Sequence, residues 1–258
     1  MRFTLNPENL RGFGGSLVIA SVICAAFVAG GALDRLQRPG ELLAKREAAL
    51  FQDFGQLGKY RAANLALTPD PHRVVFLGDS ITYFWDLETS FPGKPYLNRG
   101  IAAQTTSQML VRFRQDVVDL RPASTVILAG TNDLGDTSAV PTSISDIERN
   151  LQTMAELADT HHVRPVFASL LPVHNYKSRA PISAIRTPKN ILVVNAWLKS
   201  YCALHGYIYV DYHTAMVSPD GMMRLEFSDD GIHPNAAGHQ IMAAVAKEAL
   251  EKAPAAAQ

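Results

Sequence analysis

Cysteine is scarce in this chain, and neither sign of charge dominates. The 258 residues include 2 cysteines, and 24 Lys and Arg balance 24 Asp and Glu. Because nucleic-acid binding needs a clustered basic surface, and no such run of Lys and Arg occurs, we expect no nucleic-acid partner. No Cys-x-x-Cys pair or His-rich spacing indicates zinc, so we expect no metal site.

One stretch near the N-terminus has no charged residue at all, from Phe13 to Leu33. About 20 such residues span a bilayer, so we predict residues 1–33 to be a signal or anchor segment, either uncleaved or a long cleavable signal peptide. Ile23 is too large for the usual lipoprotein pattern before Cys24. Because Cys24 lies in this stretch, a disulfide with Cys202 is not expected.

The orientation of that segment has two opposing indications. The Lys and Arg residues on its two sides favour a cytoplasmic C-terminal side, whereas a short N-terminus before a signal-like segment usually stays inside. We predict that the rest of the chain is an exported domain that is membrane-anchored, periplasmic or secreted. The sequence does not indicate an oligomeric state.

A charged segment, residues 34–72, follows the apolar stretch. It lacks β-type alternation and is predicted to be a helical connector, interrupted at Gly55 and Gly58, that packs on the domain. The two prolines of "TPDPH" (Thr68 to His72) mark its end. Residues 73–258 then form the main folded domain.

Within this domain, strand-like and helix-like segments alternate. Five apolar runs are predicted as strands: Arg73–Leu77, Pro95–Asn98, Ser124–Ala129, Arg164–Leu170 and Tyr207–Tyr212. Four helices are predicted, at about Thr106–Leu120, Ile144–Thr160, Ile191–His205 and Asn235–Lys252. This alternation is typical of βαβ units, and strands that are apolar on both faces are covered by helices on both sides. We therefore predict an α/β fold, a three-layer α/β/α sandwich with a five-stranded parallel sheet.

Polar clusters follow the predicted strands. "GDS" (78–80) comes after the first strand, "NRGIAAQTT" (98–106) after the second and "GTND" (130–133) after the third, and "SDDGIHP" (228–234) precedes the last helix. Ligands of open α/β sheets bind beyond the carboxyl ends of the strands, so we expect these loops to meet at one edge.

The clusters contain the groups for nucleophilic catalysis. A serine hydroxyl needs a base to take its proton, usually a histidine that a carboxylate orients. Ser80 is the candidate nucleophile, His233 the base and Asp230 its partner, because Gly231 allows a tight turn between the last two. Asp229 is adjacent to Asp230, but its spacing to His233 is less favourable. Pro234 biases His233 away from helical geometry at the helix entrance.

An oxyanion also needs hydrogen-bond donors. The Ser80 N–H and the Asn132 amide are candidates, and a third donor is expected from the "NRGIAAQTT" loop. Taken singly, each cluster is also explained as a turn or a helix cap. The clusters occur together, in this order and all at strand ends, and this combination favours a catalytic role. No Gly-x-Ser-x-Gly occurs, which excludes the nucleophile elbow of the α/β-hydrolases.

Together, "FLGDSIT", "NRGIAAQTT", "AGTND" and "DDGIHPNAAGH" resemble the four blocks of the GDSL, or SGNH, esterases and lipases. The resemblance covers about residues 73–250. It implies a flavodoxin-like SGNH hydrolase fold and ester hydrolysis through an acyl-enzyme, without metal or cofactor. It assigns the catalytic roles to Ser80, Asp230 and His233, and the oxyanion hole to Ser80, Ala103 and Asn132.

Ala103 departs from the family pattern, because a glycine usually provides this amide. Its methyl group would crowd the acyl site, or strain the loop if φ is positive. We therefore expect Ala103→Gly to alter the acyl-chain preference.

The substrate pocket is less clear from sequence. Of Tyr83, Phe84 and Trp85, at least one is expected to face the core. The long loop 174–188 is either a cover over the site or a surface loop. Met222, Met223 and Phe227 either line the pocket or pack in the core.

Three functions fit these residues. The first is hydrolysis of small acyl esters or lysophospholipid-like lipids, which a membrane tether would suit. The second is removal of O-acetyl groups from carbohydrate or cell-wall glycan by the same triad. The third is a non-catalytic binding module of this fold, which the intact triad disfavours.

Overall fold

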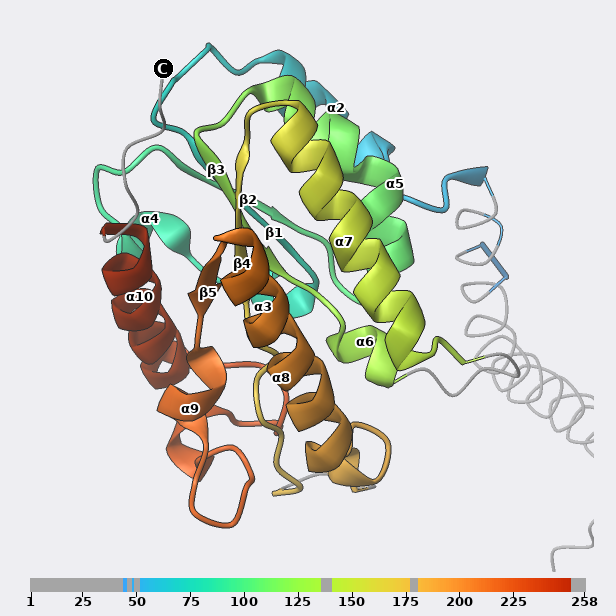
Figure 1. Cartoon of the computed structure of the whole chain (residues 1–258), viewed down its shortest axis with the longest axis vertical. Helices are drawn as coiled ribbons and strands as arrows, with labels where there is room; N and C mark the ends of the chain where they lie inside the picture. The colour runs from blue at the N-terminus through green and yellow to red at the C-terminus, as the bar shows by residue number, and fades with distance from the viewer. Residues whose placement is uncertain (1–43, 46–47, 49–51, 136–140, 177–180, 252–258) are drawn as a thin grey trace, which may run out of the picture. The chain divides into compact units, whose positions relative to one another are not determined.

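The computed structural model describes residues 44–45, 48, 52–135, 141–176 and 181–251 (Figure 1). Contacts divide the chain between Asp53 and Phe54, and every element below belongs to the second unit. The predicted signal segment, with Cys24, lies outside the described residues. Within these ranges, no helix combines the length and apolarity that a membrane crossing needs. Cys202 is buried as a free thiol.

The predicted five-stranded parallel sheet is confirmed, with strand order β2-β1-β3-β4-β5. Its strands are β1 (Val74–Gly78), β2 (Tyr96–Gly100), β3 (Ser124–Leu128), β4 (Arg164–Ala168) and β5 (Ile208–Val210). The strand order reverses between β1 and β3, the point at which open sheets of this order place their ligands. The loops after these two strands carry Ser80 and Asn132.

Helices cover both faces of the sheet. The longer helices are α2 (Gly58–Leu65), α5 (Thr106–Asp116), α7 (Ile144–Thr160), α8 (Pro188–His205) and α10 (Ala236–Glu251). The short ones are α3 (Ser80–Tyr83), α4 (Leu87–Ser90), α6 (Thr131–Leu134), α9 (Tyr212–Met216) and the 3-10 helices η2 (Val118–Leu120), η3 (Ile182–Ala184) and η4 (Leu225–Phe227). Helices α5 and α7 lie on one side of the sheet and α10 on the other (Figure 1). Helix α8 contacts α7 and β5, and α10 contacts α4 and α9. Every residue of β1 and β3 is buried, which explains their continuous apolar sequence.

Local chemistry sets the helix ends. Helix α7 has the predicted bounds, and Ser143 and Asp146 form a capping box at its start. Helix α8 begins earlier than predicted, at Pro188, because a proline suits the first helical turn and the Thr187 side chain caps it. Gly58 is the first residue of α2 rather than an interruption.

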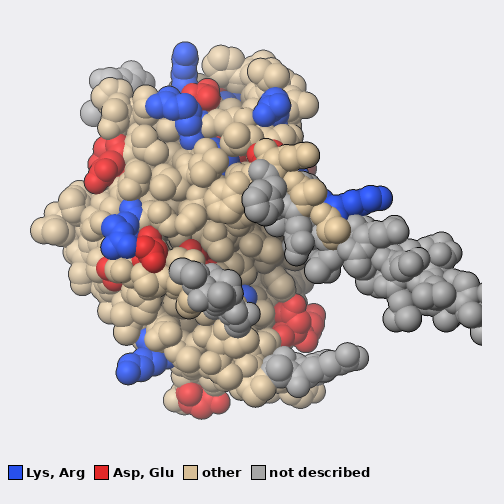
Figure 2. Space-filling view, turned by 90° about the vertical axis from the view of Figure 1, so that its right-hand side faces the viewer, with Lys and Arg blue, Asp and Glu red and all other residues tan. Residues whose placement is uncertain are grey.

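The face formed by α5 and α7 carries charges of both signs. Figure 2 shows acidic and basic side chains scattered over this face, separated by uncharged surface, without a large cluster of one sign. This distribution agrees with the balanced composition of the chain.

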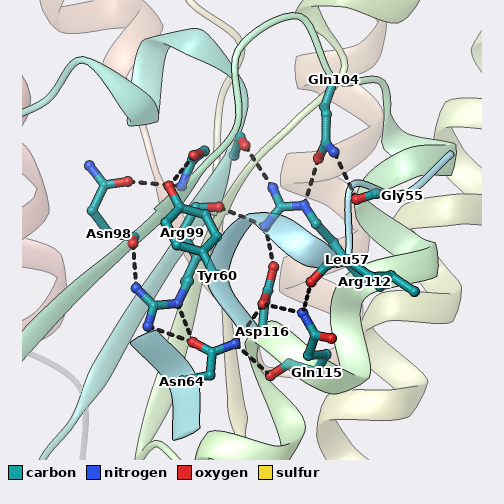
Figure 3. A network of polar contacts seen from close by, with 12 residues as sticks. Gly55, Leu57, Tyr60, Asn64, Asn98, Arg99, Gln104, Arg112, Gln115 and Asp116 are labelled. Atoms are coloured by element: carbon teal, nitrogen blue, oxygen red, sulfur yellow. Dashed lines mark hydrogen bonds and ion pairs between the residues drawn. The ribbon is translucent and has the colours of Figure 1, made fainter. Parts of the chain in front are cut away.

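A buried arginine joins the sheet to α5 behind the polar loops (Figure 3). Arg112 is fully buried and forms an ion pair with Asp116 at 3.0 Å. Its guanidinium donates to the carbonyl oxygens of Gly78 and Arg99, at 3.0 and 2.8 Å, and to Oε1 of Gln104 at 2.6 Å. Arg112 therefore holds the carboxyl ends of β1 and β2 together with the loop that follows β2.

Helix α2 is attached to the same network. Asn64 accepts hydrogen bonds from Arg99 through Oδ1 and donates to Asp116 through Nδ2 (Figure 3). Part of the predicted connector thus packs on the domain, against α5 and the end of β2.

Candidate active site

The chain turns sharply from β1 into α3, and this turn presents Ser80. Asp79 caps α3 by accepting the N–H of Ile81 at 2.8 Å. Gly78 is required because a Cβ there would lie 2.1 Å from Oγ1 of Thr82 and 2.9 Å from the Leu128 carbonyl oxygen. A buried strand therefore ends in Gly-Asp-Ser so that the hydroxyl reaches the sheet edge without a clash.

The histidine loop meets Ser80 from the other end of the sequence. Nε2 of His233 lies 2.8 Å from Oγ of Ser80, and Nδ1 of His233 lies 2.6 Å from Oδ2 of Asp230. The backbone N–H groups of His233 and Ile232 donate to Oδ1 of Asp230 at 2.8 and 2.9 Å. Gly231, with φ 92°, allows this tight turn.

The Asp230 carboxylate keeps its charge in this setting. Burial acts to raise its pKa, but hydrogen bonds from the His233 side chain and from the two N–H groups outweigh burial and lower the pKa to about 2. An ionised carboxylate on Nδ1 favours the tautomer with its proton there, which leaves Nε2 to accept from Ser80.

Asn132 comes from α6, after β3. Its Nδ2 donates to the Gln104 carbonyl oxygen at 3.0 Å, so this amide lies beside the loop that contains Ala103. Gly130, with φ 123°, precedes it. Segments that follow β1, β2 and β3 are thereby brought together with the histidine loop, as the strand-end positions of the polar clusters predict.

Comparison with known proteins identifies the fold and its class. The sequence model of the GDSL-like lipase/acylhydrolase family matches residues 76–241, more than half of the chain. The chain belongs to this family. A GDSL-like lipase of Bacteroides thetaiotaomicron is 34% identical, with a TM-score of 0.71 over 78% of this chain and 100% of that one. Ser80, Asn132 and His233 lie within the matched range, and the chain is a carboxylic ester hydrolase.

Two further relatives are more distant. An acetylxylan esterase of Geobacillus stearothermophilus, solved as a catalytic mutant, has 16% identity and a TM-score of 0.55 over 71% of this chain and 95% of that one, which shows a shared fold. The Bacillus subtilis protein called uncharacterized lipoprotein YqeF is 32% identical over 79 residues, which are 30% of this chain and 32% of that protein. That match therefore spans about a third of the relative's length.

Ala103 has a backbone conformation that favours glycine. Its φ is 65°, in the left-handed region, and the residue is exposed. We expect Ala103→Gly to raise stability by up to about 1 kcal/mol, since the left-handed strain ends while glycine loses more backbone entropy. Without the methyl group, relative rates on long and short acyl esters should also change. Thermal unfolding measures the change in stability, and a series of esters of different chain length measures the acyl-chain preference. Identical chain-length profiles for the two proteins would contradict the steric effect of the methyl group.

Two buried carboxylates support the site without reaching His233. Asp79 is buried, and burial raises its pKa to about 6 despite the hydrogen bond from the Ile81 N–H. Asp133 accepts from the Thr106 N–H at 3.0 Å and from its hydroxyl at 2.6 Å, which ties α6 to the start of α5. The last residue of "GTND" thus joins the loop after β3 to the start of α5.

Aromatic side chains border the histidine. The Phe84 ring meets the His233 ring edge-on, with centroids 5.4 Å apart, and Phe84 is 57% exposed. Tyr83 lies beside Phe84, with ring centroids 5.2 Å apart. Trp85 is buried, which confirms that one of the three aromatic residues faces the core.

The surface of the described domain has two open cavities, and the first is lined in part by Phe84. One, of 560 Å³, is lined by Phe84, Trp85, Pro234 and His239 among others. The second, of 720 Å³, is lined by residues that include His174, Tyr176 and Met222. Met223 also lines the second cavity, although it is almost wholly buried, and Phe227 packs in the core.

Loop 174–188, predicted as either a cover over the site or a surface loop, contributes two residues that contact the predicted site. His174 bonds Gly231 through its backbone N–H at 3.0 Å, and its Nε2 lies 3.1 Å from the Ser228 carbonyl oxygen. Arg186 contacts Asn132. No motif marks either residue, and only the fold places them beside the predicted loops.

Proposed function

We propose that this esterase acts through an acyl-enzyme formed on Ser80, with His233 as the base and Asp230 as its orienting carboxylate. The observation that carries the proposal is the continuous chain of contacts from Ser80 Oγ to His233 Nε2 at 2.8 Å and from His233 Nδ1 to Asp230 at 2.6 Å. A nucleophile, a base and an oriented base partner within hydrogen-bond distance are the arrangement that this chemistry requires.

In the first half-reaction, Oγ of Ser80 attacks the ester carbonyl carbon while its proton passes to Nε2 of His233. The charge on the carbonyl oxygen is stabilised by the N–H groups of Ser80 and Ala103 and by Nδ2 of Asn132. The tetrahedral intermediate then collapses, and His233 gives the proton to the departing alcohol. Asp230 stabilises the imidazolium throughout.

In the second half-reaction, water repeats the sequence on the acyl-enzyme. His233 takes a proton from the water, and the hydroxide adds to the acyl carbon. The carboxylic acid leaves as the proton returns to Ser80. No step in this scheme needs a metal or a cofactor.

We propose small acyl esters or lysophospholipid-like lipids as substrates. An exposed row of rings leads away from the base: Phe84 beside His233, then Tyr83, over which Nζ of Lys59 lies 5.1 Å from the ring centroid. Apolar rings that end at a cation suit an amphiphile with an anionic or zwitterionic head. O-acetyl carbohydrate is the competing substrate, and it enters as an outcome of the test below.

We propose an exported location with an N-terminal membrane anchor. The uncharged run from Phe13 to Leu33 supports it, and so does the partial match to a bacterial lipoprotein. Protease accessibility of the catalytic domain in intact cells tests this location.

A chain-length series tests the catalytic proposal. Wild type and Ser80→Ala are compared on p-nitrophenyl esters from acetyl to long acyl chains, and on acetylated xylan. We expect wild-type turnover on the nitrophenyl esters and loss of at least about 10⁴-fold in the variant. Activity confined to the acetyl ester and xylan would favour the carbohydrate esterase. Comparable rates in both forms would overturn Ser80 as nucleophile.

A further inference from the structure

Arg186 lies in the segment between β4 and α8, far in sequence from the four catalytic blocks. Its half-buried guanidinium donates through Nε to the Thr131 carbonyl oxygen at 3.0 Å and through Nη2 to Oδ1 of Asn132 at 3.3 Å. A Cβ at Gly135 would lie 2.3 Å from Cζ of Arg186. The residue that follows α6 is therefore a glycine at the place where the guanidinium packs.

These contacts determine which end of the Asn132 amide faces the site. Oδ1 accepts from Arg186, while Nδ2 donates to the Gln104 carbonyl oxygen at 3.0 Å. In the flipped amide, the NH₂ group would face the guanidinium and the oxygen would face a carbonyl oxygen. Both contacts would be repulsive, because arginine has no acceptor and a carbonyl has no donor.

The positive charge of Arg186 also makes the Asn132 amide a stronger hydrogen-bond donor. A cation that hydrogen-bonds the amide oxygen draws electron density from the nitrogen, so the N–H bonds become stronger donors. Nδ2 donates to the Gln104 carbonyl oxygen and also lies 3.5 Å from Oδ2 of Asp79, so both acceptors favour the same orientation of the amide. An oxyanion would meet an amide whose orientation is already set, which is the condition under which such donors are most effective.

We propose that Arg186 is a positioning residue for the oxyanion hole, which holds the Asn132 side chain as a donor through the transition state. This role rests on the proposed function of Asn132. Arg186 and His174, both from between β4 and α8, then support the site, since His174 also holds the histidine loop.

A double-mutant cycle tests this role. Arg186→Ala and Asn132→Ala are measured singly and together on p-nitrophenyl acetate, with Lys189→Ala, an exposed residue nearby, as the matched control. We expect Asn132→Ala to lower kcat by about 10²- to 10³-fold. Arg186→Ala should lower kcat by about 10- to 100-fold with little change in KM, yet by less than about 3-fold when Asn132 is already alanine.

Arg186→Lys separates charge from geometry. Lysine keeps the charge but cannot donate from two nitrogens in one plane, so we expect it to restore thermal stability more fully than kcat. An equal fall in kcat from Arg186→Ala in the wild-type and Asn132→Ala backgrounds would overturn the proposal. A rise in KM with kcat unchanged would also overturn it. The Ser80→Ala and Asn132→Ala results come first: if Ser80→Ala stays active, the proposed mechanism fails, and if only Asn132→Ala is silent, the oxyanion assignment fails.

Discussion

Replacing His233 with alanine is expected to lower kcat on p-nitrophenyl acetate by about 10⁴- to 10⁶-fold. Nε2 of His233 lies 2.8 Å from Oγ of Ser80, and among the described residues no other side chain is hydrogen-bonded to this hydroxyl to accept its proton. Stability should change little, because the ring lies at the edge of the sheet and its side chain is 32% exposed. Steady-state kinetics beside thermal unfolding measure both effects.

The two adjacent aspartates provide a matched control for the same mechanism. Asp230→Asn should lower kcat by about 10⁴-fold, because an amide on Nδ1 permits the wrong imidazole tautomer. Asp229→Asn should stay within about 2-fold of wild type, since Asp230 is the residue that contacts the imidazole. Equal effects from the two substitutions, or an active His233→Ala, would contradict the assigned roles.

The second large effect is on stability. Arg112→Met should lower the free energy of unfolding by about 3–5 kcal/mol, because it leaves Asp116 buried and without its ion pair. It also removes the donor to the carbonyl oxygens of Gly78 and Arg99 at the ends of two strands. Urea denaturation followed by circular dichroism measures the loss.

Arg114→Met is the control on the same helix. Arg114 pairs with Asp119 at 3.9 Å, and both side chains are 58% exposed, so its loss should cost less than about 1 kcal/mol. If Arg112→Met proves too unstable to purify, Arg112→Lys keeps the charge and should fall between the two. Equal midpoints for Arg112→Met and Arg114→Met would contradict the role given to the buried network.

The strands, and the meeting of the polar loops at the strand ends, could be predicted because their signals are local. An apolar run on both faces, as in β1 and β3, is visible in sequence, and so is a Gly-Asp-Ser turn or an Asp three residues before a His. Helix ends were less accurate where one residue decides them, as Pro188 does for α8. The conformation of Ala103 could be posed as a question from sequence, but its φ of 65° came only from the structure.

The supporting residues could not be predicted, because their signals are not local. Arg186 and Asn132 are 54 residues apart, and nothing in either motif points to the other. Arg112 lies in a polar helical stretch, where an exposed side chain would be expected from sequence. It is nevertheless fully buried, because two strand ends and Asp116 compensate its charge. The roles of Arg186 and Arg112 depend on which distant residues pack against them, and only the folded structure shows this.

The acylation of Ser80 during turnover is tested most directly with a fluorophosphonate probe. Such probes react with an activated serine and remain attached, so intact-mass measurement and peptide mapping locate the modified residue. We predict one adduct on wild type, mapped to Ser80, with none on Ser80→Ala and much slower labelling of His233→Ala. An adduct on another residue, or undiminished labelling of Ser80→Ala, would contradict the mechanism.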